Sequence, residues 1–206
     1  MKKFIFILLF GLCACKPGLD SSPKMELELE SLKKCIESEQ REFLEMVVES
    51  FEMKIQKQYP KLSTEKGYFE FISDWSNKKL NKDFFNDSLD LKVRSLDLWT
   101  ESIRSDKNME LEKKLFNVDS MNPVRVKLNI EFSSCLSKTI DWRKGISNFL
   151  RVNSKYRISP RHARKYLYKT SEYDLKKFEN RLAIVLGVYY QTMFNIKNTV
   201  ANNAYD

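Results

Sequence analysis

Residues 171–200 read SEYDLKKFENRLAIVLGVYYQTMFNIKNTV and contain the clearest helical pattern of the chain. Large side chains recur there at intervals of three and four residues, which is the spacing of one face of an α-helix. Ser171 and Asp174 form an imperfect capping box, because aspartate stands where glutamate is usual. This stretch predicts a long terminal helix with one apolar stripe, formed by Leu175, Phe178, Leu182, Val185, Tyr189, Met193, Ile196 and Val200.

Several other parts of the chain also show helical spacing. Residues 25–58 lack glycine and proline and combine an apolar stripe with many glutamates, and Pro60 ends this long amphipathic helix. Ser63-Thr64 supplies an N-cap for a second helix, and residues 83–105 fit a third one. Ser159-Pro160 opens a short helix, because serine is a favourable N-cap and proline fits the first helical position. These stretches predict neighbouring helices joined by short loops.

Residues 124–132 are compatible with two kinds of structure. Apolar and polar residues alternate strictly there, which is typical of a half-buried strand. A helix competes, because Asn122-Pro123 supplies a cap followed by proline and a spacing of four and three continues through residues 128–149. We favour the helix, whose repeating positions are Leu128, Phe132, Cys135, Thr139, Trp142, Ile146 and Phe149. The whole pattern then predicts an all-α helical bundle of about five to seven helices, in a single domain over residues 25–206.

The amino terminus has the layout of a bacterial export signal. Lys2-Lys3 is followed by an apolar stretch that is too short to span a bilayer as a stable helix. The junction Leu12-Cys13-Ala14-Cys15 resembles the lipobox of bacterial lipoproteins, which implies removal of residues 1–14 and acylation of Cys15. An ordinary secreted protein with a chance cysteine at its cleavage site is the alternative. Residues 15–24 contain proline, glycine and serine without an apolar period, so we expect a flexible tether.

Composition and motifs narrow the function classes. With 42% hydrophobic and 31% charged residues, the chain can bury a core but is too polar for an integral membrane bundle. Its sequence has five glycines, one histidine and no dinucleotide-binding, P-loop, HExxH or CxxC motif. A zinc site built from Cys35, Cys135 and His162 would require three distant segments to converge, so we expect no metal and no cofactor. We therefore expect a binding or structural protein and no enzyme.

Cys35 and Cys135 are the cysteines that remain beyond the signal segment and the expected lipidation site. In an exported protein they can form a disulfide, which would join the acidic first helix to the later basic half of the chain. Two separate buried thiols are the alternative. The sequence leaves both possibilities open.

Basic residues are concentrated in the second half of the chain. Residues 122–206 carry 16 basic and 6 acidic side chains, and residues 151–169 contain no acid. The helix expected from Pro160 places basic side chains on one stripe, while Ala163 and Leu167 face inward. The candidate ligand-binding residues are Arg157, Arg161, Arg164, Lys165, Tyr168 and Lys169.

Such a surface is suited to bind a polyanion. Arginine binds sulfate or phosphate groups bidentately, and each ion pair with a polyanion releases counterions. For an exported protein the expected polyanions are sulfated glycosaminoglycans or the anionic headgroups of lipids, and nucleic acid is not expected. A solvated face and internal pairing with the acidic first helix are the alternatives.

A short signal with a lipobox, a brief tether and a helical domain rich in Lys, Glu, Asn and Ser resemble the surface lipoproteins of Borrelia spirochaetes. The resemblance lies in architecture, and its one motif, residues 12–15, is shared by bacterial lipoproteins in general. It implies a lipid-anchored protein of the outer membrane, displayed on the cell surface, with an adhesin-like role in host interaction and virulence. The implied partners are glycosaminoglycan-bearing or other extracellular host proteins. Alternatives are capture of a complement regulator or a structural envelope role facing the periplasm.

Overall fold

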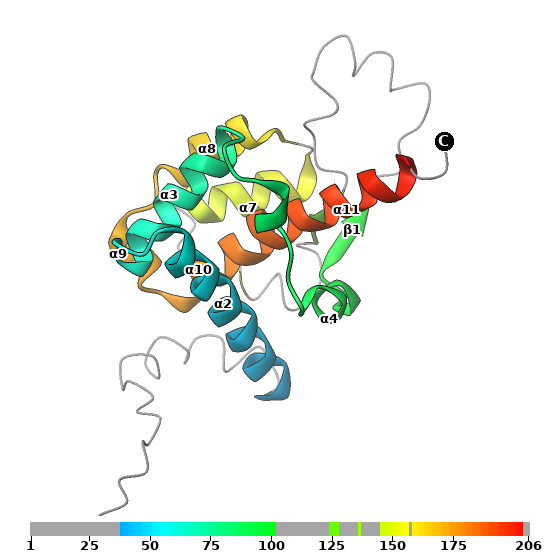
Figure 1. The fold of residues 1–206 in the computed structure, drawn as a ribbon, viewed down its shortest axis with the longest axis horizontal. Coiled ribbons are helices and arrows are strands. Elements are labelled where there is room, and N and C mark those ends of the chain that lie inside the picture. Colours follow the sequence, from blue (N-terminus) through cyan, green and yellow to red (C-terminus); the bar gives the residue numbers. More distant parts are fainter. Residues whose placement is uncertain (1–37, 102–123, 128–135, 137–144, 157, 204–206) are drawn as a thin grey trace, which may run out of the picture.

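The computed structural model describes residues 38–101, 124–127, 136, 145–156 and 158–203. The expected signal segment and tether, Cys35 and Cys135 lie outside these residues. Helices account for 72% of the described residues, which confirms an all-α helical bundle. The elements, drawn in Figure 1, are α2 (Ser38–Gln58), α3 (Thr64–Ser76), the 3-10 turn η1 (Lys82–Phe84), α4 (Asp90–Ser95), β1 (Trp99–Glu101), β2 (Val124–Val126), α7 (Gly145–Lys155), α8 (Pro160–Leu167), α9 (Glu172–Leu175), α10 (Phe178–Ile184), the π-helical turn η3 (Val185–Tyr190) and α11 (Gln191–Asn203).

The helical run of α10, η3 and α11 passes through the centre of the molecule (Figure 1, orange to red). All residues from Leu182 to Gln191 are buried. A helix that is buried around its whole circumference must be enclosed by other elements. The sequence predicts one apolar stripe here, and the structure differs because side chains that face away from this stripe, such as Ala183 and Ile184, are buried as well.

The other helices enclose this central run. α2 packs against α10 and η3, and α7 packs against α10. α3 packs against α2, while α8 packs against both α3 and α7. α8 therefore lies in an outer position, separated from the central run by helices on which it rests.

An aromatic cluster joins α2, α3 and η3. The Phe51 ring lies 5.4 Å from that of Tyr68 and 4.9 Å from that of Phe71, both in edge-to-face geometry. Tyr189 approaches the same ring at 4.8 Å. Such pairs each add about 0.5–1.5 kcal/mol beyond the burial of their area. The cluster fixes α2 against the central run.

The helix boundaries follow the predicted caps. α2 ends at Gln58, two residues before Pro60. The Ser63 hydroxyl accepts a hydrogen bond from Lys66 N at 3.4 Å, and Ser159 Oγ accepts one from His162 N at 3.3 Å. The capping box of Ser171 and Asp174 is present, with both reciprocal bonds formed. These predictions are confirmed.

The prediction of one helix over residues 83–105 is wrong. The structure contains η1, a loop, the short helix α4 and strand β1 in this stretch. The Asp87 carboxylate accepts a hydrogen bond from Leu89 N at 2.8 Å and another from Ser50 Oγ at 2.9 Å. An aspartate that binds the backbone two residues ahead competes with the helical bond at that position. The helical spacing of this stretch therefore gives way to a local turn.

The favoured helix at the start of residues 124–132 is also wrong, because Val124–Val126 forms strand β2. β2 pairs antiparallel with β1, so that Trp99 lies opposite Val126 and Glu101 opposite Val124. Val124 and Val126 are buried and Arg125 is half-buried, as the alternating pattern predicts. Asn195 of α11 holds the strand, accepting from Val124 N at 3.0 Å and donating to Val124 O at 3.2 Å. Residues 128–135 lie outside the described part of the chain.

A close approach between α2 and α3 at Gly67 gives a test of this packing. A Cβ atom added to Gly67 would lie 2.3 Å from Ile55 Cγ2, far inside van der Waals contact. We expect Gly67→Ala to lower the free energy of unfolding by about 1–3 kcal/mol in urea denaturation. Glycine to alanine in a roomy helix interior instead stabilises by about 0.5–1 kcal/mol, so the sign is informative.

The Ile55→Ala background supplies the control, because Cγ2 is absent there. Gly67→Ala is expected to cost much less in that background than in the wild type. An equal cost in both backgrounds would contradict the contact between these two positions.

Candidate functional site

Helix α8 presents the predicted basic surface. Ser159 caps it and Pro160 occupies its first turn. Ala163 and Leu167 are buried, being 1% and 0% exposed, so they fix the inward face of the helix as the sequence predicts. The inward face of α8 packs on α3 and α7, and the basic side chains lie on the outward face.

The structure places most of the predicted ligand-binding residues on this outward face. Arg161, Lys165 and Lys169 are exposed, and Arg164 is half-buried. α8 ends at Leu167, so Lys169 lies in the following turn and does not continue the helical stripe as expected. Arg157 lies outside the described residues. We call Arg161, Arg164, Lys165, Tyr168 and Lys169 the α8 surface.

Arg164 is the anchored member of the α8 surface. Its Nη1 donates to Asn77 Oδ1 at 3.1 Å, which joins α8 to the end of α3. Its guanidinium carbon lies 4.3 Å from the centroid of the Tyr168 ring, in cation–π geometry. Tyr168 is 44% exposed and keeps one side of the pair open to solvent.

Internal ion pairs do not neutralise the α8 surface within the described residues. Ion pairs between residues far apart in the sequence use other basic residues. Arg181 Nε lies 3.3 Å from Glu52 Oε1, Lys197 pairs with Asp90, and Lys127 pairs with Asp97. Over the same residues no carboxylate lies within ion-pair distance of the basic side chains of the α8 surface. Pairing between the acidic and basic halves therefore exists, but elsewhere in the fold.

Glu52 is a half-buried carboxylate with a perturbed pKa. Burial raises the pKa of Glu52 above its ordinary value of 4.5, and Arg181 together with the Tyr68 hydroxyl offsets part of the rise. Tyr68 donates to Glu52 Oε1 at 3.1 Å. Because the folded state disfavours ionisation of this group, its contribution to stability decreases as the pH rises from the unfolded pKa through the folded one.

We expect Glu52→Gln to become more stable relative to the wild type as the pH increases from about 4 to about 7. Glutamine keeps an acceptor for the Tyr68 hydroxyl and cannot ionise. The measurement is the free energy of unfolding of both proteins at several pH values. Glu42→Gln, which changes an exposed residue of α2, corrects for the loss of one acidic group. A stability difference that decreases over this range would contradict the raised pKa.

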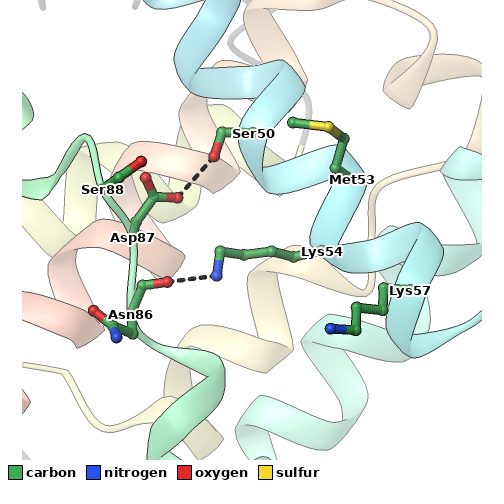
Figure 2. A pocket seen from close by; sticks show the side chains of 7 residues that line it. All are labelled: Ser50, Met53, Lys54, Lys57, Asn86, Asp87 and Ser88. Atoms are coloured by element: carbon green, nitrogen blue, oxygen red, sulfur yellow. Dashed lines mark hydrogen bonds between the residues drawn. The ribbon is translucent and has the colours of Figure 1, made fainter.

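A groove that the sequence analysis did not single out lies between α2 and the loop after η1. It is open, has a volume of about 530 Å³ and is shown in Figure 2. Lys54 Nζ donates to the backbone oxygen of Asn86 across it. The residues that line it are Ser50, Met53, Lys54, Lys57, Asn86, Asp87 and Ser88.

Asp87, which lines this groove, holds the loop in place through hydrogen bonds. Both of its carboxylate oxygens accept hydrogen bonds, one from Ser50 and one from Leu89 N. Burial raises the pKa of the Tyr189 and Tyr190 hydroxyls well above the ordinary value, and the nearby Asp87 carboxylate raises both further. Tyr189 donates to the backbone oxygen of Asn86 at 3.2 Å. These interactions hold the loop after η1 against the central run, and the role of Asp87 in them is structural.

The described residues contain no group of three or more His, Cys, Asp or Glu side chains placed to bind a metal ion. His162 is exposed on α8. None of the helices described here combines the length and hydropathy that a membrane span requires.

Comparison with protein-family models, with curated proteins and with solved structures found no match for this chain. The α8 surface, exposed and basic, is the candidate binding site.

Proposed function

We propose that this chain is a binding protein for an extended polyanion, which contacts the α8 surface. One observation carries the proposal: Arg161, Lys165 and Lys169 are exposed, and no carboxylate among the described residues pairs with them. Unpaired cations on a folded surface attract polyanions because binding releases counterions from the polymer.

The form of the surface favours an extended ligand. Arg161 and Lys165 lie one helical turn apart, about 6 Å along the axis. They project from a convex helix, and the residues of the groove in Figure 2 belong to other elements. A chain with repeated anionic groups can contact several of these cations at once. Arg164 on Tyr168 adds a planar donor that matches sulfate geometry.

The expected location determines which polyanion is proposed. A signal segment over residues 1–14 and acylation of Cys15 would place the domain outside the cytoplasm, attached to a membrane by lipid. Sulfated glycosaminoglycans are the extended polyanions of host surfaces and matrix. We therefore propose a surface lipoprotein of the outer membrane with an adhesin-like role, which binds such polysaccharides without catalysing a reaction.

Replacing Arg161, Lys165 and Lys169 by glutamine tests the proposal. These changes remove three charges and leave the caps and the inward face of α8 intact. On immobilised heparin we expect the affinity at about 0.1 M salt to decrease at least tenfold, and the slope of log Kd against log salt to decrease by about two to three. The protein is the chain over residues 15–206 with Cys15→Ser.

A matched variant carries Lys57→Gln, Lys61→Gln and Lys66→Gln, which neutralise three exposed lysines of α2, α3 and the loop between them. It has the same net charge as the first variant and is expected to retain most of the binding. An equal loss in both variants would mean that net charge alone attracts heparin. Binding to anionic lipid vesicles and not to heparin would assign the surface to headgroups. Either result contradicts the proposal.

A further inference from the structure

The turn that follows α3 contains a lysine in a conformation that favours glycine. Lys78 has φ 56°, and no other described non-glycine residue has a positive φ. Lys78 N donates to Trp75 O at 3.1 Å and Lys79 N donates to Asp74 O at 2.8 Å. These two bonds form a Schellman motif, whose left-handed position is usually occupied by glycine.

Lysine at this position is disfavoured by local sterics. The Cβ atom of an L-residue approaches the following carbonyl oxygen in the left-handed region, so the backbone is strained there. The side chain of Lys78 is exposed, and among the described residues it forms no ion pair or side-chain hydrogen bond that would offset the strain. Residues held in strained conformations cluster at active sites, ligand clamps and switch regions.

This turn borders the α8 surface. Asn77, the residue before Lys78, accepts the hydrogen bond from Arg164 Nη1, so the two helix ends are joined directly. α3 and α8 also pack along each other. Lys79 is exposed too, but its Nζ lies 3.8 Å from Asp74 Oδ1, so a carboxylate already partners it. Lys78 directly follows the residue that binds Arg164, and no carboxylate among the described residues pairs with it.

We propose that the polyanion site spans two helices and that Lys78 is one of its contact residues, which binds a sulfate group of the polysaccharide beside the one bound by Arg164. This inference rests on the proposed function of the α8 surface. A ligand that crosses from α8 to the end of α3 follows a path set by Arg164 and Asn77. The dipole of α3 favours a positive charge near its carboxyl end. Lys79 already supplies such a charge, so the dipole does not explain why residue 78 is a lysine.

Substitutions of Lys78 separate binding from stability. Lys78→Gly is expected to raise the melting temperature by roughly 2–4 °C, because it relieves the strain. The same substitution is expected to weaken binding to heparin about threefold to tenfold and to decrease the salt slope by about one. Lys78→Asn, neutral and tolerant of the left-handed region, is expected to lose the same affinity. Lys78→Arg is expected to retain binding.

The outcomes separate this inference from the function on which it rests. A gain in stability with loss of affinity in both neutral variants supports the two-helix site. Wild-type affinity and salt slope in Lys78→Gly, when the triple variant of the α8 surface has lost binding, would overturn the inference and leave the proposed function intact. Failure of the wild-type chain to bind heparin would overturn both. Lys61→Asn, in the loop before α3, controls for the loss of one charge.

Discussion

The fold depends on the burial of the helical run from Leu182 to Gln191 around its whole circumference. Each large apolar side chain removed from water contributes about 1.5–3 kcal/mol, and this run can bury all of its side chains only if other elements enclose it. α2 and α7 pack against it directly, and Phe51 joins α2 to Tyr189 within the aromatic cluster. α3 packs on α2 and also reaches α11, where Trp75 donates to Thr192, and α8 rests on α3 and α7. The position of the candidate site is thus a consequence of the core.

The same arrangement determines how charge is distributed. The acidic first half and the basic second half of the chain meet across the bundle through pairs such as Glu52 with Arg181. The basic residues of these pairs lie in α10, in α11 and directly after β2. α8 is turned so that Ala163 and Leu167 face the bundle, and its basic residues cannot reach that interface. Part of the positive charge is therefore displayed on the outward face of α8, where no described carboxylate pairs with it.

Local signals in the sequence predict much of this structure. The caps at Ser63, Ser159 and Ser171 are recognised correctly, because each depends on residues three positions apart. Residues 182–190, LAIVLGVYY, contain no polar side chain other than the tyrosine hydroxyls, which indicates burial on all sides of the helix. The prediction of one apolar stripe uses only part of this pattern. Residues 83–105 and 124–126 are mistaken for helix because their structure depends on distant partners, Ser50 and Asn195 among them. The bond from Arg164 to Asn77 likewise joins residues 87 positions apart, which no local spacing can predict.

The pairing of β1 with β2 has a consequence for how the chain can change over time. Glu101 and Val124 lie opposite each other, and Asn195 fastens Val124 to α11, so both ends of the intervening segment are fixed to the core. The entropy of closing a segment between fixed ends grows only logarithmically with its length, by about 0.6 kcal/mol for each doubling. The register of β1 and β2, which α11 holds through Asn195, therefore tolerates a change in the length of the chain between Glu101 and Val124 better than a change at either residue.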